Sequence, residues 1–449
     1  MPTILEAAPA LDLNYVRAQF PSLAQTVNGH PAAFLDGPGG TQVPQRVIDA
    51  ISGYLGRDNA NTGGAYATSR NTDALIARAR AAMADFLNCA ADEVAFGPNM
   101  TTLTYAISRA IGRELGPGDE ILVTRLDHDA NVSPWLAMAE DRGVTVRWAE
   151  IHDENCTLDI ADLSSKINDR TKLVAVGYAS NAVGTINPVK VITRLAHAAG
   201  ALAYVDAVHY GPHGLIDVAA LDCDFLACST YKFFGPHMGV LYGKRELLKK
   251  FRPYKVRANT NAIPNCWEWG TLNHECIAGI EACVEYIADL GRHHVKGLPH
   301  PSRFSKEGNH ESSESPTGSI TERRVAIESA YAAIHEHERT LVERMMSGLK
   351  SIPELKIYGI TNPERFNDRC ATFAVRDVSG KPGRSPLELA TKLGDRGFFT
   401  WDGNYYALNL TEHLDVEKTG GFLRIGLVHY NTADEVDRLL AALREILAA

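Results

Sequence analysis

From about residue 80 to residue 245, the pattern of apolar and polar positions alternates between two periods. Short runs that are apolar on both faces predict buried strands, and segments whose apolar residues recur every three to four positions predict amphipathic helices. The expected strands are DEVAFGP, EILVTRL, VTVRWAEI, KLVAVGYAS, ALAYVDAVHY, FLACSTY and GVLYGK. Strands of this kind, separated by helices, predict an α/β fold with a largely parallel sheet covered on both sides.

The pattern changes twice after residue 275. The helix ECIAGIEACVEYIADLG closes the first region, and residues 291–322, rich in Ser, Gly, Pro and His, predict a polar surface insertion. A long helix from about 323 to 350, strands near 354–359 and 370–376, and a closing helix follow. We expect four parts: an N-terminal segment, 1–30, that packs with the small domain; a large domain, 31–290; the insertion, 291–322; and a smaller α+β domain, 323–449.

Composition excludes several classes of protein. The 449 residues are 45% hydrophobic and 22% charged, which is an ordinary globular composition. A net charge of −9 argues against a nucleic-acid partner, and no apolar stretch approaches the length of a membrane span. The first residues lack a basic start and an apolar core, so we expect no signal peptide. Eight cysteines, several within apolar runs, are typical of reduced thiols, and we expect a cytoplasmic protein.

Neither histidine nor cysteine spacing predicts a metal site. The histidines of the insertion are irregularly spaced and have no nearby cysteine, which favours a solvated loop. The pairs Cys223/Cys228 and Cys276/Cys283 do not match a zinc-binding pattern. We therefore expect no metal.

Lys232 ends the apolar run LDCDFLACST and precedes a Gly-Pro break. A lysine at the end of a buried strand has two interpretations. It is paired with a carboxylate, here Asp222 or Asp224, or it is desolvated so that its amine becomes reactive.

Polar residues also follow the neighbouring predicted strands. Asp206, Asn181 and His128 each come after an apolar run, and Thr101 and Thr102 stand at a predicted helix N-terminus, where a phosphate binds well. Each has a plainer alternative: a turn or cap for the aspartate, a helix cap for the threonines, a simple hydrogen bond for the histidine. Together with the lysine they describe a site for pyridoxal 5'-phosphate (PLP), which needs an imine-forming lysine and a carboxylate against its pyridinium nitrogen.

Residues from about 30 to 290 and from 420 to 445 resemble the class V aminotransferase group of fold-type I PLP enzymes, and within it the cysteine-desulfurase-like branch. The matching segments are YVDAVHYGPHG, YASNAVGTINPV, HDANVSPW, STYKFFGPHMGVLYG, WEWGTLN and FLRIGLVHYNTADEVDRL. The resemblance implies a mainly parallel, seven-stranded-type sheet flanked by helices, with a smaller α+β C-terminal domain. It also implies a homodimer with shared active sites.

The resemblance assigns a role to each candidate residue. Lys232 would form the imine with the cofactor and transfer protons, and Asp206 would pair with the pyridinium nitrogen. His128 would stack on the ring, and Asn181 and His209 would lie near its phenolic oxygen. Relatives commonly have glutamine where this chain has His209. The remaining roles are phosphate binding by Thr101, Thr102 and Ser229, phosphate binding in the neighbouring subunit by Thr271, and a bidentate grip on the substrate carboxylate by Arg424. For Arg424 the alternative is a surface ion pair, which its place in an apolar strand disfavours.

The chain departs from the branch at one functional position. A cysteine desulfurase needs a mobile thiol before the carboxylate-binding arginine, and residues 397–426 contain no cysteine. Tyr406 falls where that thiol would be, and Trp401 falls where relatives often have arginine. We expect Tyr406 to form a wall of the substrate cleft, with an acid–base role as the alternative. Asn61, in NANTGGAY, would line the substrate entrance.

We therefore expect a PLP-dependent enzyme that acts on an α-amino acid through a carbanion at the α-carbon. The expected reaction is lyase chemistry, a β-elimination or replacement without a persulfide relay. The alternatives are C–C or C–N bond formation with a carbonyl co-substrate, as in the fungal loline-pathway enzyme, epimerisation, amine transfer, and a catalytically silent sensor. The expected partners are a small amino-acid substrate and a second copy of the chain, with no nucleic acid and no membrane.

Overall fold

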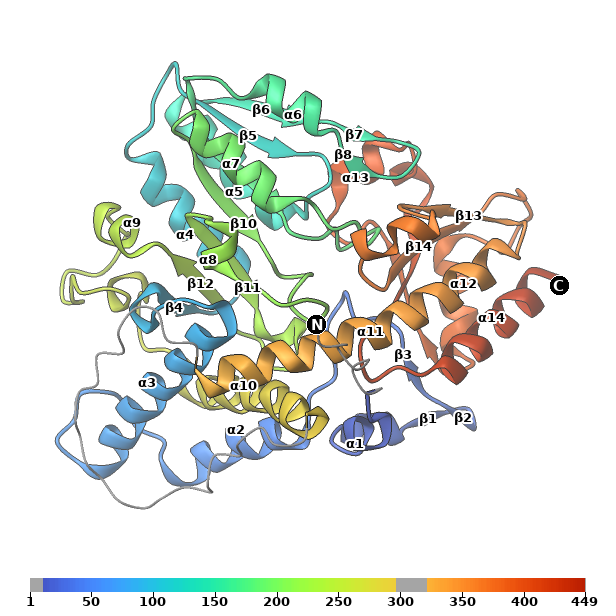
Figure 1. Ribbon diagram of the computed structural model, residues 1–449, viewed down its shortest axis with the longest axis horizontal. Coiled ribbons are helices and arrows are strands. Elements are labelled where there is room, and N and C mark those ends of the chain that lie inside the picture. The colour runs from blue at the N-terminus through green and yellow to red at the C-terminus, as the bar shows by residue number, and fades with distance from the viewer. Residues whose placement is uncertain (1–10, 296–320, 449) are drawn as a thin grey trace, which may run out of the picture.

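A computed structural model describes residues 11–295 and 321–448. Its central sheet has seven strands in the order β4-β12-β11-β10-β9-β5-β6 (Figure 1). Their bounds are β4 Val94–Gly97, β5 Glu120–Thr124, β6 Thr145–Ala149, β9 Thr171–Gly177, β10 Leu202–Asp206, β11 Phe225–Ser229 and β12 Gly239–Gly243. Strand β12 is antiparallel to both of its neighbours, and the pairs from β11 to β6 are all parallel. The predicted mainly parallel seven-stranded sheet is confirmed.

Both faces of this sheet are buried. Leu122 and Val174 belong to one hydrophobic core, while Ile121, Val123 and Leu173, their neighbours in sequence, belong to another. Successive side chains of a strand point to opposite faces, so a strand between two cores must be apolar throughout. The helices around the sheet are α2 Gln45–Arg57, α3 Ala67–Leu87, α4 Met100–Gly112, α5 Ser133–Arg142, α6 Ile160–Lys166, α7 Val189–Ala198, α8 Val218–Leu221, α9 Arg245–Lys250 and α10 His274–His294.

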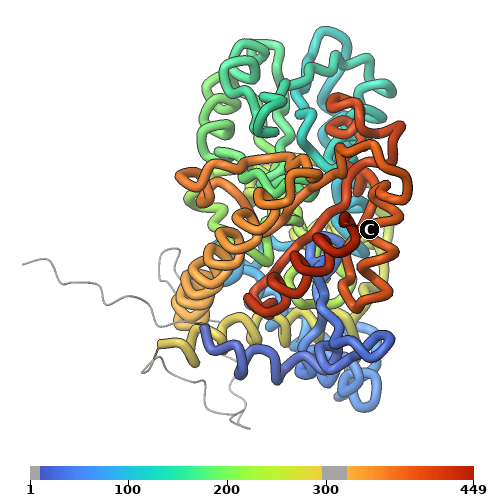
Figure 2. Tube along the Cα trace, turned by 90° about the vertical axis from the view of Figure 1, so that its right-hand side faces the viewer, coloured from blue at the N-terminus to red at the C-terminus, as the bar shows by residue number. Residues whose placement is uncertain are grey.

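A second sheet has four antiparallel strands in the order β13-β14-β17-β16. They are β13 Leu355–Tyr358, β14 Thr372–Asp377, β16 Trp401–Gly403 and β17 Phe422–Gly426, and the helices of this region are α11 Glu322–Lys350, α12 Pro386–Gly394, α13 Leu408–His413 and α14 Ala433–Ala448. Helices α11 and α14 lie side by side (Figure 2) and share a third core with the sheet. The long helix and the strand pair expected after residue 322 are confirmed.

Several short elements lie outside the two main sheets. They are α1 Leu13–Arg17, β1 Thr26–Val27, β2 His30–Pro31, β3 Ala33–Phe34, β7 Ile151–His152, β8 Thr157–Leu158 and β15 Phe398–Phe399. Strand β3 pairs in parallel with β15, and Arg17 forms an ion pair with Glu435 of α14. The N-terminal segment thus contacts the last third of the chain. Most of the expected insertion at 291–322 lies outside the described residues.

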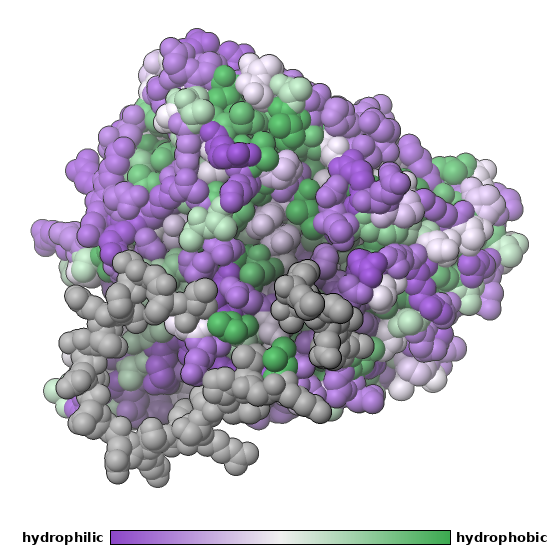
Figure 3. Space-filling view, viewed as in Figure 1, coloured by the Kyte–Doolittle hydropathy of each residue, from purple (hydrophilic) through white to green (hydrophobic). Residues whose placement is uncertain are grey.

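The face of the molecule in Figure 3 is mostly hydrophilic, with apolar residues gathered in the upper part of the view. Of the helices within 11–295 and 321–448, none is both long enough and apolar enough to cross a membrane.

Candidate functional site

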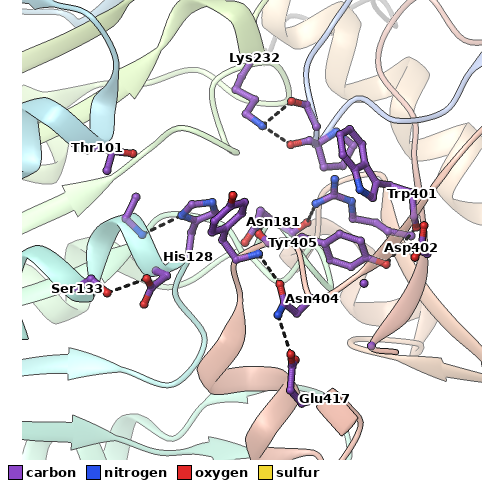
Figure 4. Close-up of a pocket in the computed structure, with 18 of the residues that line it drawn as sticks. Thr101, His128, Ser133, Asn181, Lys232, Trp401, Asp402, Asn404, Tyr405 and Glu417 are labelled. Atoms are coloured by element: carbon purple, nitrogen blue, oxygen red, sulfur yellow. Dashed lines mark hydrogen bonds between the residues drawn. The ribbon is translucent and has the colours of Figure 1, made fainter. Parts of the chain in front are cut away.

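The candidate site lies at the carboxyl ends of the central strands, where ligands collect in parallel sheets. Asp206 is the last residue of β10, Ser229 is the last residue of β11, and Lys232 follows three positions later. We call the deep space here the inner cavity, of about 80 Å³; it opens beside an outer cavity of about 740 Å³. The inner cavity is lined by the predicted residues Thr101, His128, Asn181, Asp206, His209, Ser229 and Lys232. The outer cavity adds Trp401, Tyr406 and Arg424 (Figure 4).

The amine of Lys232 is buried and has no carboxylate partner among the described residues. Lys232 is 9% exposed, and its Nζ donates to the carbonyl oxygens of Pro38 and Gly39, the latter at 3.0 Å (Figure 4). The ion pair that the sequence left open does not form: Asp222 and Asp224 both pair with Lys244 instead. Burial, helped by the charge of Arg424, lowers the pKa of Lys232 to about 7. A substantial fraction of the amine is therefore uncharged near neutral pH, as a nucleophile requires.

Asp206 is a buried carboxylate with one free oxygen. Its Oδ1 accepts a hydrogen bond from the N–H of Val208 at 2.8 Å, and within the described part of the chain nothing donates to its other oxygen. Burial raises its pKa to about 6, against the opposing charge of Lys232. A cationic N–H beside that oxygen would satisfy the buried carboxylate. A pyridinium nitrogen is such a group.

The N-terminus of α4 lines one part of the inner cavity. The Oδ1 atom of Asn99 caps the helix by accepting from the N–H of Thr102, and the Oγ of Ser229 accepts from the N–H of Met100. A Cβ on Gly239 would lie 2.4 Å from the carbonyl carbon of Asn99, so this glycine lets the helix start close to the sheet. The N–H of Thr101, between those of Met100 and Thr102, has no hydrogen-bond partner in the described chain, and with the helix dipole it makes this end a good anion site.

The remaining polar groups of the inner cavity have unused atoms. The Nδ1 of His128 accepts from the N–H of Ala130 at 3.0 Å, and burial lowers the pKa of His128 to about 4, so the ring is neutral. The Oδ1 of Asn181 and the Nδ1 of His209 are buried and have no hydrogen-bond partner among the described residues. Buried polar atoms without partners are costly in a finished core. Here the free oxygen of Asn181 fits a polar ligand such as PLP.

Arg424 projects from β17 into the outer cavity and is 3% exposed. Its Nη1 donates to the carbonyl oxygen of Asn181 at 3.0 Å, and its guanidinium lies 4.0 Å from the centre of the Tyr405 ring. It forms no salt bridge with the acidic residues of the described chain, and its Nε has no partner there. Burial lowers its pKa to about 10, so it remains charged at neutral pH. A buried guanidinium without a counter-ion suits a carboxylate ligand. The surface ion pair considered from the sequence is wrong.

Two consecutive tyrosines form the wall of the outer cavity. Tyr405 and Tyr406 have φ values of 56° and 61°, in the left-handed region that residues other than glycine rarely adopt. The carbonyl oxygen of Tyr406 accepts from the N–H of Asp129 at 2.7 Å, and that of Tyr405 accepts from Asn181 at 2.8 Å. The Tyr406 ring, 71% exposed, stacks on His128 with 5.5 Å between the ring centres. Contacts to the segments that follow β5 and β9 therefore hold this wall in place.

Sequence reasoning did not predict three contacts within the site. The carbonyl oxygens of Pro38 and Gly39 hold the lysine, and the Tyr405 ring covers Arg424. The glycines of the run FLDGPGG are the available signal for a close approach of backbone at this point. Nothing in the sequence distinguishes Tyr405 from Tyr406.

Three predicted residues lie apart from the site in a single chain. Thr102 and Thr271 line a different pocket, of about 350 Å³, together with Trp269. Asn61 is exposed, and its carbonyl oxygen accepts from Ser69 at 2.6 Å, away from both cavities. The expected role of Thr271 requires a second subunit, so it remains a prediction.

Comparisons with known proteins agree with this geometry. Residues 33–302 and 324–439 match the family described as Aminotransferase class-V. A cysteine desulfurase of Pectobacterium carotovorum is 30% identical, covering 96% of this chain and 97% of the relative. The Aminotransferase-like protein FGM3 of Gibberella zeae is also 30% identical, covering 98% and 100%. In fold, the chain resembles an apo cysteine desulfurase from Thermococcus onnurineus, with a TM-score of 0.81 and 24% identity over 99% of this chain and 100% of that one.

Proposed function

We propose a reaction for this chain, which belongs to the class V aminotransferase family of PLP-dependent enzymes. The proposed reaction is a β-elimination or β-replacement on an α-amino acid that carries a leaving group, such as a thiol, at its β-carbon. In the elimination, the substrate loses its Cα proton and the leaving group at Cβ. Reaction with water then yields a keto acid and ammonia, and the leaving group departs in its protonated form.

The residues of the inner cavity would hold the cofactor. Lys232 would bind it through its amine and Asp206 through the free carboxylate oxygen. The amides at the start of α4, with Thr101 and Ser229, would hold its phosphate, and His128 would cover its ring. When bound, PLP supplies an electron sink that allows a bond at the substrate α-carbon to break.

The chain's own groups would bind the substrate and move its proton. Arg424 would hold the substrate carboxylate in a bidentate grip, which fixes the α-carbon between the inner and outer cavities. The amine of Lys232, with its pKa lowered to about 7, can accept the Cα proton and later return one. Tyr406 would form the wall beside the departing group and exclude water from that side.

The main support for this reaction is that none of the eight cysteines, all of which lie in the described part of the chain, lines the outer cavity. A persulfide relay needs a thiolate that can reach the substrate sulfur. The position expected for it holds Tyr406. Sulfur released from a cysteine-like substrate would therefore leave as a small molecule and would not stay on the protein.

A second candidate is bond formation to a second substrate. An amino acid held by Arg424 would occupy only part of an outer cavity of about 740 Å³. The unfilled part could admit a nucleophile for β-replacement or a carbonyl compound for C–C bond formation. The size of the cavity is the observation that favours this candidate.

The experiment is a screen of amino acids with the holoenzyme, read by product mass and by mass spectrometry of the intact protein. Cysteine or a β-substituted alanine should yield pyruvate and ammonia, with no added sulfur on the protein. Addition of a thiol or an aldehyde distinguishes replacement or bond formation from elimination, because the mass of the co-substrate then appears in the product. A stable persulfide on the protein, or a keto acid that retains the β-substituent, would contradict the proposed elimination.

A further inference from the structure

A buried cluster of nitrogen and sulfur atoms lies in the wall behind the inner cavity. One ring nitrogen each from His209 and His213, and the Sγ of Cys370, lie within 4.8 Å of one another. All three side chains are buried. The histidines follow β10, and Cys370 comes two residues before β14, so two distant segments meet here.

His213 is oriented in the way that metal-binding histidines are. Its Nδ1 is 2.7 Å from the Oε2 of Glu338, on α11. Its Nε2 is buried and finds no hydrogen-bond partner in the part of the chain that the structure describes. A carboxylate that holds one ring nitrogen fixes the tautomer and leaves the other nitrogen as a lone-pair donor. Glu338 thus leaves Nε2 free to bind a metal ion.

His209 and Cys370 supply the other two donors. The His209 ring lies edge-on to the His213 ring, with 5.1 Å between ring centres, and its Nε2 is 3.1 Å from the Oγ1 of Thr372. One nitrogen hydrogen-bonds the threonine and the other has no partner within the described residues. Cys370 is a free cysteine, and burial raises the pKa of its thiol. A bound metal ion would favour the thiolate, because metal binding displaces the thiol proton.

The cluster can be reached from solvent. His213, Glu338 and Cys370 line a second large pocket, of about 610 Å³, which shares no lining residue with the inner cavity. The charged group nearest to Cys370 in sequence is Arg369, whose guanidinium donates to the carbonyl oxygens of Ile360, Cys370 and Thr372. A thiolate and the Glu338 carboxylate would balance a divalent cation beside it. The pocket provides an entry path and room for a water ligand.

We propose that His209, His213 and Cys370 bind a thiophilic divalent cation, with Zn²⁺ the best match to two imidazoles and one thiolate. A water molecule from the second pocket would complete the tetrahedron. Since His209 also lines the inner cavity, the ion would fix that ring in the wall of the cofactor site. Sequence spacing could not indicate this site, because Cys370 lies far along the chain from both histidines.

The test measures zinc bound by the full-length holoprotein. The protein is dialysed against a chelator, then against ZnCl₂, and its metal content is determined by mass spectrometry. We expect about one zinc per chain, and a loss of most of it in both Cys370→Ser and His213→Gln. The matched controls Cys276→Ser and His30→Gln, which change a half-buried cysteine and an exposed histidine elsewhere, should retain it. Circular dichroism verifies that each variant is folded, and either altered variant alone suffices if the other does not fold.

A cobalt titration identifies the donors independently of turnover. Co²⁺ bound by the unaltered protein should show visible d–d bands of a tetrahedral ion, and Cys370→Ser should remove their sulfur-dependent intensity. Failure of the unaltered protein to bind zinc after dialysis would overturn the proposal, as would full zinc retention in either variant that folds. Because the readout is metal content and absorption, it does not depend on which reaction the protein catalyses.

Discussion

The inner and outer walls of the site differ in the kind of backbone that carries their side chains and in how far those side chains are buried. On the inner wall, Asp206, Ser229 and Lys232 stand on or just beyond the ends of parallel strands and are buried. On the outer wall, Trp401 begins the short strand β16 and is 51% exposed, while Tyr406 is 71% exposed in the loop after that strand, where Tyr405 and Tyr406 are both left-handed. A sheet edge positions groups rigidly, whereas a loop can change its side chains without disturbing the core. The inner wall is therefore suited to hold a common cofactor, and the outer wall to determine what happens to the substrate.

Two residues of the outer wall, Tyr405 and Tyr406, have a left-handed backbone. A non-glycine residue in the left-handed region costs on the order of 1 kcal/mol or more, and it persists where surrounding contacts impose it. Here the contacts are the hydrogen bonds from Asn181 and Asp129 to the carbonyl oxygens of the tyrosines. The tyrosine pair is thus connected to the inner wall through its backbone, while its side chains face the outer cavity and Arg424. Substitutions on either wall can therefore be tested separately.

The largest expected effect is the loss of turnover when Lys232, on the inner wall, is replaced. Lys232→Ala should lower turnover by roughly 10³-fold or more, since it removes both the imine-forming amine and the proton carrier. Steady-state product formation is the measurement, with the cofactor absorption spectrum as a second readout. Lys244→Ala is the matched control, because that lysine pairs with Asp222 and Asp224 outside the site. Comparable turnover in the two variants would remove Lys232 from the mechanism.

The next largest effect is expected on substrate binding by Arg424, which lies between the two walls. Arg424→Lys keeps the positive charge but loses the bidentate hydrogen bonding to the substrate carboxylate. The KM for the amino acid should therefore rise roughly 10- to 100-fold while kcat changes less. Kinetics over a range of substrate concentrations separates the two constants. Arg344→Lys, on an exposed pair with Asp437, should leave both unchanged. An unchanged KM in Arg424→Lys would mean that the substrate carboxylate binds elsewhere.

The pH dependence of cofactor uptake tests the inner wall without any substitution. The amine of Lys232, with a pKa of about 7, is neutral above that pH, and the Asp206 carboxyl, with a pKa of about 6, is ionised above its own. Both changes in protonation favour PLP binding as the pH rises. The fraction of neutral amine increases roughly tenfold between about pH 6 and about pH 8. The rate at which PLP-stripped protein takes up PLP should rise accordingly, and a flat or falling profile would argue against an amine of lowered pKa.

The smallest effect should be confined to the outer wall. Tyr406→Ala should change the relative kcat/KM for amino acids of different side-chain size by roughly three- to tenfold, because it removes one side of the cleft. The absorption of the bound cofactor should stay the same. Tyr254→Ala, at an exposed tyrosine away from both cavities, is the control. A large loss of turnover with every substrate would instead favour an acid–base role for the hydroxyl of Tyr406.

The inner wall can be predicted from the sequence, and the outer wall can be predicted only in part. Buried parallel strands have a strong apolar signature, and polar residues at their ends must gather at one edge. That physical rule alone brings Asp206, Asn181 and Lys232 together. The family resemblance adds Arg424, and ungapped alignment of the loop places Tyr406 near it.

What could not be predicted depends on contacts between distant segments. Pro38 and Gly39 accept hydrogen bonds from Lys232 through their backbone carbonyl oxygens. Because every residue has such an oxygen, the residue types do not indicate these contacts. The left-handed backbone of Tyr405 and its position over Arg424 follow from tertiary contacts, and tyrosine has no local preference for them. The meeting of Cys370 with His213 has the same origin, since neither residue lies near the other in sequence.

The most direct test of the central claim is to locate the covalent link between protein and cofactor. Reduction of the holoprotein with borohydride, followed by proteolysis and mass spectrometry, fixes PLP to the amine that holds it. We expect a single modified peptide that contains Lys232. A label on another lysine, or no label on a protein that retains its cofactor and activity, would contradict it.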